Sequence, residues 1–144
     1  MTVKLIDKKG DSDIKKKIAE LADKTDHRTL AIWATDGAEH VLSYFEERYP
    51  KDDRPRKAIE AGRAWVRGEI SVGDARSAAL AAHAAARVAE DGSPRAAARA
   101  AGHAAATAHM AGHAVHAADY AANANAKERD WQYQHLLDLR KYPI

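Results

Sequence analysis

The chain has 144 residues, enough for one domain with a buried core and too few for two domains of ordinary size. Its 23 Lys and Arg residues nearly balance its 21 Asp and Glu residues, and a net charge of +2 does not favour a nucleic-acid-binding protein. Cysteine is absent, which excludes disulfides, thiolate metal sites and a cysteine nucleophile.

Alanine sets the expected fold class. Of the 144 residues, 34 are alanine, which has the highest helix propensity, whereas the β-branched residues that strands prefer are scarce. We expect an all-α, single-domain, alanine-rich bundle of five to seven helices over residues 1–144, with residues 1–12 as a flexible segment. The first residues lack the apolar core of a secretory signal, so we expect a cytoplasmic protein.

Three helices are expected in the first half of the chain. The first runs from Asp13 to about Asp23. The second follows Asp26, which can cap it. The third follows Asp53 and has Pro55 in its first turn, where the missing N–H costs nothing. The second helix carries an apolar stripe that we expect to face the core: Leu30, Trp33, Ala34, Gly37, Val41, Tyr44 and Phe45.

Three further helical stretches are expected in the second half. Ser71 with Asp74 resembles a capping box, and Ser93 is expected to cap the next helix, with Pro94 at its first helical position. The second of these stretches stops at the Asn-Ala-Asn string that begins at Asn123. The expected stretches are 72–90, 93–123 with a break within 107–112, and about 127–139.

The 19 residues from 100 through 118 contain no Lys, Arg, Asp or Glu. They do not predict a membrane span, because alanine gains little from transfer into lipid and histidine is costly there. A short similarity links residues 81–87 with 101–107, and we attribute it to the alanine-rich composition. Four histidines lie in the uncharged run: His103, His109, His113 and His116.

The histidines carry the candidate chemistry. If this region forms one continuous helix, four side chains spaced by four, three and four residues lie within an arc of about 60° around its axis. His103 would lie more than 80° away from this arc. The four are His109, His113, His116 and Tyr120. Three histidines could bind a divalent transition metal, namely His109, His113 and His116. The favoured interpretation is that the imidazoles fill polar gaps between alanine-rich helices by hydrogen bonding.

Asp36 and His40 lie four residues apart on the second helix. If the histidine stripe faces that helix, they would complete a mixed carboxylate–imidazole site. The full set of candidate binding residues is Asp36, His40, His103, His109, His113, His116 and Tyr120.

Other catalytic signatures are missing from the sequence. It contains no GxGxxG string, Walker loop, GxSxG elbow or HExxH motif. A charged row on the third helix is expected to be a solvated, ion-paired face: Arg54, Arg56, Glu60, Arg63 and Arg67.

Two distinctive strings stand in the first half of the chain, Asp-Asp-Arg-Pro-Arg at 52–56 and Arg-Ala-Trp-Val-Arg-Gly-Glu at 63–69. They belong to longer segments, and the full set of matching segments is 30–42, 44–70, 78–87, 104–114 and 128–136. Together these segments resemble the immunity-five-like family of bacterial and archaeal putative immunity proteins over about residues 27–139.

This resemblance implies an all-α protein that binds and neutralises a cognate toxin without catalysis, and therefore a protein partner and no cofactor. The alternative that the histidines support is a metal-binding protein or small enzyme, with a divalent transition metal or substrate held between the second helix and residues 103–120. Association of the alanine-rich helices into a homodimer is a third alternative.

Overall fold

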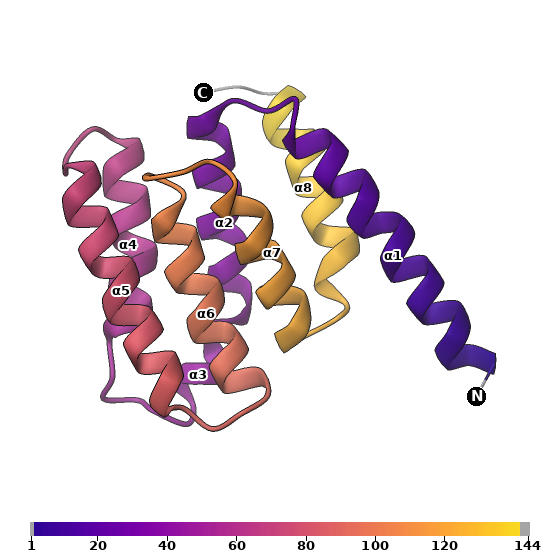
Figure 1. Ribbon diagram of the computed structural model, residues 1–144, viewed down its shortest axis with the longest axis horizontal. Coiled ribbons are helices and arrows are strands. Elements are labelled where there is room, and N and C mark those ends of the chain that lie inside the picture. The colour runs from indigo at the N-terminus through magenta and orange to yellow at the C-terminus, as the bar shows by residue number, and fades with distance from the viewer. Residues whose placement is uncertain (1, 142–144) are drawn as a thin grey trace.

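The computed structural model describes residues 2–141, and all regular structure in this part of the chain is helical (Figure 1). This confirms the predicted all-α class. Seven helices have 12 or more residues, and α3 is a single turn of four residues. The helices are α1 (Thr2–Ala22), α2 (His27–Val41), α3 (Ser43–Glu46), α4 (Arg54–Val66), α5 (Val72–Val88), α6 (Ser93–Ala106), α7 (His113–Ala124) and α8 (Glu128–Lys141).

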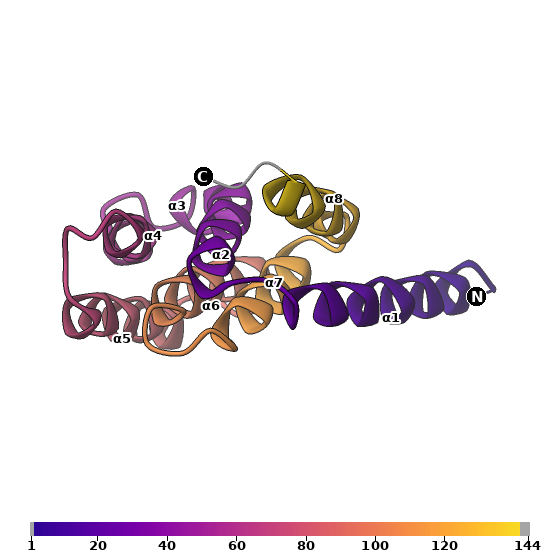
Figure 2. The same ribbon diagram turned by 90° about the horizontal axis from the view of Figure 1, so that it is seen from above.

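The helices form two layers (Figure 2). One layer contains α2, α4 and α8, and the other contains α5, α6 and α7. Helix α6 lies at the centre, because it packs against both neighbours in its own layer and against α2, α3 and α4. Helix α1 contacts α7 and α8, and its N-terminal end projects away from the body (Figures 1 and 2).

Alanine side chains make the close packing around α6. Eight of its residues are buried, and all but Gly102 are alanine: Ala96, Ala97, Ala98, Ala100, Ala101, Gly102, Ala104 and Ala105. A methyl group keeps neighbouring helix axes close and loses no rotamer freedom on burial. This packing lets one central helix touch five others.

Larger apolar side chains occupy the surroundings of α2. Trp33, Phe45 and Leu136 are buried, and the Trp33 indole Nε1 donates a hydrogen bond of 2.9 Å to the carbonyl of Gln132. This bond joins α2 to α8. The stripe expected to face the core is buried except for Tyr44, which is partly buried.

Two predicted helix caps are confirmed. The Asp26 carboxylate accepts a hydrogen bond of 3.0 Å from the backbone N–H of Thr29, at the start of α2. The Ser71 hydroxyl accepts one of 3.1 Å from the backbone N–H of Asp74, at the start of α5. Each bond satisfies an amide that the helix itself leaves without an acceptor.

Two other helix starts differ from the prediction. Asp53 precedes α4, but its carboxylate pairs with Lys57 instead of capping the helix. Helix α6 begins at Ser93 itself, because Gly92 takes the preceding position with a φ of +100° that other residues rarely adopt. The Ser93 hydroxyl is then free to donate to the carbonyl of Ala124, which ties the start of α6 to the end of α7.

The uncharged run forms a hairpin of two helices. Helix α6 ends at Ala106 and α7 begins at His113, so the break predicted within 107–112 is confirmed and a continuous helix is excluded. No helix in the described part of the chain is long and apolar enough to cross a membrane. At the N-terminus, α1 begins at Thr2 instead of Asp13, so the helix covers most of the segment expected to be flexible.

Gly62 lies where α4 crosses α6, and this contact predicts a stability difference. A Cβ added at Gly62 would stand 2.7 Å from Cγ2 of Thr35, a buried side chain whose hydroxyl donates to the carbonyl of Ala31. We expect Gly62→Ala to lower the free energy of unfolding by about 1–3 kcal/mol, measured by urea denaturation. Gly73→Ala is the matched control, because its Cβ meets only Ser71 Oγ at 3.7 Å. Equal stability of the two variants would contradict this packing.

Candidate functional site

The α6–α7 hairpin brings His103 against the histidines of α7. The His103 ring centroid lies 5.2 Å from that of His113 and 5.5 Å from that of His116. On its other side, His103 stacks on Tyr120, with centroids 5.2 Å apart and planes at 7°. The hairpin therefore gathers four of the predicted binding residues, including the one that a continuous helix would have turned away.

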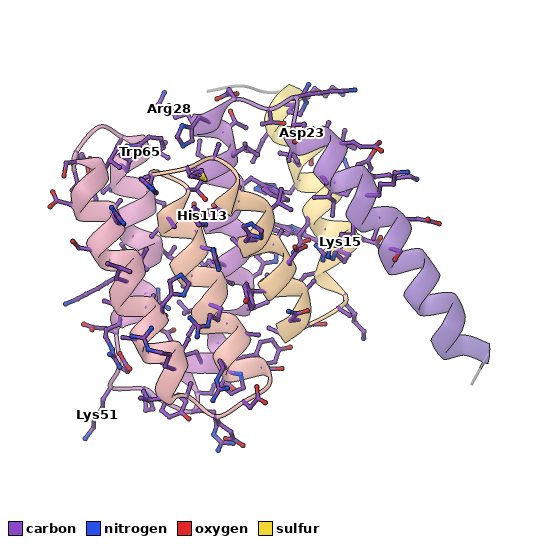
Figure 3. The ribbon with its side chains drawn as sticks, in the orientation of Figure 1. Lys15, Asp23, Arg28, Lys51, Trp65 and His113 are labelled. Carbon is purple, nitrogen blue, oxygen red and sulfur yellow. The ribbon has the colours of Figure 1, made fainter. Side chains whose placement is uncertain are left out.

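His103 and His113 share a direct hydrogen bond. Their Nδ1 atoms lie 3.1 Å apart, so one Nδ1 carries a hydrogen and donates while the other accepts. The two rings cannot both be protonated at Nδ1 and keep this bond. His113 stands on the face of the α5–α6–α7 layer nearest the viewer in Figure 3.

His83 of α5 joins this group, although it is not one of the predicted binding residues. Its ring lies 4.8 Å from that of His103, and its Nδ1 lies 3.2 Å from Nη1 of Arg99. Gly102 makes the approach possible, because a Cβ there would stand 2.6–2.8 Å from the His83 ring. The similarity between residues 81–87 and 101–107 contained the signal, since it pairs His83 with His103.

Burial and neighbouring positive charge disfavour protonation in this group. Burial, together with smaller effects of positive charge on His83, His113, His116 and Arg99, lowers the pKa of His103 to about 4. Burial also lowers the pKa of His83 and of His113 below the ordinary histidine value. The interior of the group is therefore neutral near pH 7.

The remaining α7 candidates are closer to solvent. His109 lies in the turn between α6 and α7 and is exposed, and His116 is exposed on α7. No group of three or more His, Cys, Asp or Glu side chains between residues 2 and 141 is arranged to hold a metal ion. Metal binding by His109, His113 and His116 stays a prediction.

Asp36 and His40 lie elsewhere, between α2, α4 and α8. Asp36 Oδ2 is 2.8 Å from Nε2 of His135, and Asp36 Oδ1 accepts a 3.0 Å hydrogen bond from Arg63. His40 Nδ1 is 3.0 Å from Glu128 Oε1. The predicted mixed site between the second helix and residues 103–120 is therefore replaced by two separate groups in opposite layers.

Trp131 of α8 joins the two histidines of the second group. Its ring centroid lies 3.6 Å from that of His40 and 4.6 Å from that of His135. The indole lies over Gly37 of α2, where an added Cβ would make only an ordinary van der Waals contact of 3.8 Å with the ring. The three rings lie in a row, with Glu128 beside His40 at one end and Asp36 beside His135 at the other. Because both histidines are hydrogen-bonded to these carboxylates, we interpret the row as a structural polar contact between α2 and α8.

The arginines of α4 and Arg67, which follows its last residue, are paired, and this confirms the predicted ion-paired face. Each of them is within salt-bridge distance of a carboxylate, and Arg63 contacts two. The pairs are Arg54–Asp52, Arg56–Glu46, Arg63–Asp36, Arg63–Glu39 and Arg67–Glu69.

The fold and the two groups define a small all-α protein with an alanine-packed body and histidines gathered in both layers. The sequence model of the family described as Imm-5 like putative immunity protein matches residues 20–139. The chain belongs to this family, and the resemblance drawn from its strings is confirmed. Searches of curated proteins and of solved structures found no match.

The pKa of His103 predicts how stability depends on pH. Below pH 6.5 the unfolded chain takes up a proton at this ring, whereas the folded chain resists it until about pH 4. The free energy of unfolding is therefore expected to fall between pH 6.5 and pH 4, with about 1–2 kcal/mol from His103 because solvent reaches part of the ring. Urea denaturation across this range measures it.

His103→Gln is the control for that measurement. The variant should lose the part of the pH dependence that comes from His103, while the carboxylates contribute equally to both proteins. Identical pH profiles for the natural protein and the variant, or a His103 ring that titrates near pH 6.5 by NMR, would contradict the assignment.

Proposed function

We propose that this protein binds a protein toxin and neutralises it without catalysis, in the cytoplasm of the cell that makes it. The match to the immunity-protein family over residues 20–139 carries this proposal. Neutralisation by binding requires an exposed surface that is already ordered before the partner arrives. The alanine-packed body supports such a surface, because its helices have little side-chain freedom to lose.

The test is protection of growing cells. Secreted and cell-associated proteins of the source strain would be expressed one at a time in a sensitive bacterium, with and without this chain. We expect one toxic protein whose growth arrest is relieved by this chain and which co-purifies with it in a fixed ratio. Trp33→Ala is a control that should abolish protection, because it empties the core around α2. Absence of protection against every toxic protein would contradict the proposal.

A second candidate function is supported by the His103 and His113 contact. Two nitrogens bound to one zinc ion at about 2.0–2.1 Å are about 2.8–3.4 Å apart for bond angles between 90° and the tetrahedral value. The observed Nδ1 separation is 3.1 Å. The exposed His116 ring stands nearby, 5.5 Å from that of His103 and 6.0 Å from that of His113. We propose a divalent transition-metal site there as the alternative, with His103 in place of the expected His109, which lies in the exposed turn between α6 and α7.

Titration with zinc chloride and with nickel chloride tests this alternative. Tag-free protein should bind about one equivalent by calorimetry and unfold at a higher temperature with metal present. His113→Gln should lose both effects. His135→Gln, in the other layer, should keep both. Equal binding by the two variants, or no binding by the natural protein, would contradict a metal site at His103 and His113.

A further inference from the structure

Large exposed apolar side chains gather on α5. Leu80 is 61% exposed and Val88 is 75% exposed, and Val72 at the start of the helix is 41% exposed. In the described part of the chain, only Met110 joins them as an exposed large apolar residue. Three of these four residues therefore lie on one helix. Such a concentration of exposed apolar side chains is more typical of an interaction surface than of a helix that faces only water.

The same side of α5 carries arginines without acidic partners. Arg76 and Arg87 lie within about 40° of Leu80 around the helix axis at 100° per residue, and both are exposed. No carboxylate of the described residues lies within salt-bridge distance of Arg76, Arg87 or Arg99. The arginines of α4, by contrast, are all paired. We define the α5 face as Arg76, Leu80, Arg87 and Val88.

A hollow adjoins the α5 face at Arg99. It has a volume of about 300 Å³. Arg99 lies on its wall and also contacts His83 on α5, so this side chain connects the hollow with α5. Arg95 lines it too, although this side chain is held by the carbonyls of Ala86 and Ala89. The remaining lining residues are Asp91, Gly92, Ala96, Tyr120 and Asn123.

Basic residues outnumber acidic residues around this surface. No Asp or Glu occurs from residue 75 through 89 or from 92 through 118, so α5 beyond its first turn, all of α6 and the first half of α7 lack carboxylates. The only acidic residues between these ranges are Glu90 and Asp91, at the turn. Glu90 pairs with Arg48, and Asp91, which lines the hollow, lies 3.7 Å from Arg95. The surface therefore offers positive charge and hydrogen-bond donors beside apolar side chains.

We propose that the α5 face, together with the Arg99 hollow, is the surface that docks the protein partner, and that the partner presents an acidic surface with apolar residues between its carboxylates. This inference rests on the proposed function and names the surface that performs it. A carboxylate of the partner enters the hollow and accepts hydrogen bonds from Arg99, while Leu80 and Val88 pack against its apolar residues. Arginine and large apolar side chains that lose their water on contact dominate the energy of such interfaces.

The composition of the surface favours a protein over a nucleic acid. Three unpaired arginines offer few phosphate contacts, whereas nucleic-acid binding relies on many. Leu80 and Val88 would gain nothing against a phosphate backbone, but they gain about 25 cal/mol for each Å² of apolar area removed from water against an apolar partner surface. The charge of the α5 face then gives the partner its orientation and a fast, salt-dependent association.

Site-specific cross-linking in the source cells tests the location. A photoreactive phenylalanine would replace Leu80 in one variant and Glu60, exposed on the paired face of α4, in a second. We expect the Leu80 position to capture one protein, with cross-linked peptides from an acidic surface, and the Glu60 position to capture none. Capture of a second copy of this chain or of nucleic acid from Leu80, capture of the partner from Glu60 only, or no capture from Leu80 would overturn the proposal.

Charge reversal tests the chemistry with the protein that protection or cross-linking identifies. Arg76→Glu with Arg87→Glu should weaken binding by about tenfold or more, and added salt should weaken the natural pair in the same direction. Arg67→Glu, on the paired face, should change binding less than about twofold. Arg99→Gln should weaken binding without changing the free energy of unfolding by more than about 0.5 kcal/mol.

These outcomes separate the two proposals. If the natural protein protects cells and the double variant protects equally well while folding normally, the α5 face is not the docking surface and the proposed function stands. If the natural protein protects against no toxin, the proposed function fails, and cross-linking from Leu80 still decides whether the α5 face binds an acidic protein.

Discussion

The close contact of alanine-lined helices around α6 is the constraint on which the rest of the structure depends. Seven buried methyl groups and Gly102 let five other helices reach one central helix. A larger side chain at any of these positions would push a neighbour outward, since close-packed interiors have no spare volume. The same closeness leaves little apolar volume in the α5–α6–α7 layer, so the larger core residues, Trp33 and Phe45 among them, gather around α2.

This constraint also determines where polar groups can lie. Helices at short separation leave gaps of imidazole size at their edges, and His83 fills one of these beside Gly102. His103 and His113 fill the next one and satisfy each other by a hydrogen bond. Side chains that cannot turn inward remain on the outer side of the layer, where Arg76 and Leu80 stand without partners. The candidate site and the docking surface are thus two consequences of one way of packing.

The sequence predicted the elements well and their spatial relations only in part. Caps such as Asp26 and Ser71, and the aromatic stripe around Trp33, have local signatures, and they are confirmed. The direction in which α7 returns from α6 has no such signature. Because alanine occurs on every side of these two helices, the sequence does not distinguish a buried face from an exposed one. His103 was therefore placed away from His113, and Asp36 was matched with the wrong helix, since its partners come from distant parts of the chain.

The most direct measurement is the coupling between ring nitrogens across the hydrogen bond of His103 and His113. In protein labelled with ¹⁵N-histidine near pH 7, the hairpin account predicts a through-bond correlation between the two Nδ1 atoms, which stand 3.1 Å apart. It also predicts that the series of helical hydrogen bonds from α6 ends at Met110 and that α7 starts a new one, so the helical pattern is interrupted before His113. Helical contacts that continue from Ala106 to His113, with no correlation between the two rings, would show one unbroken helix and contradict the account.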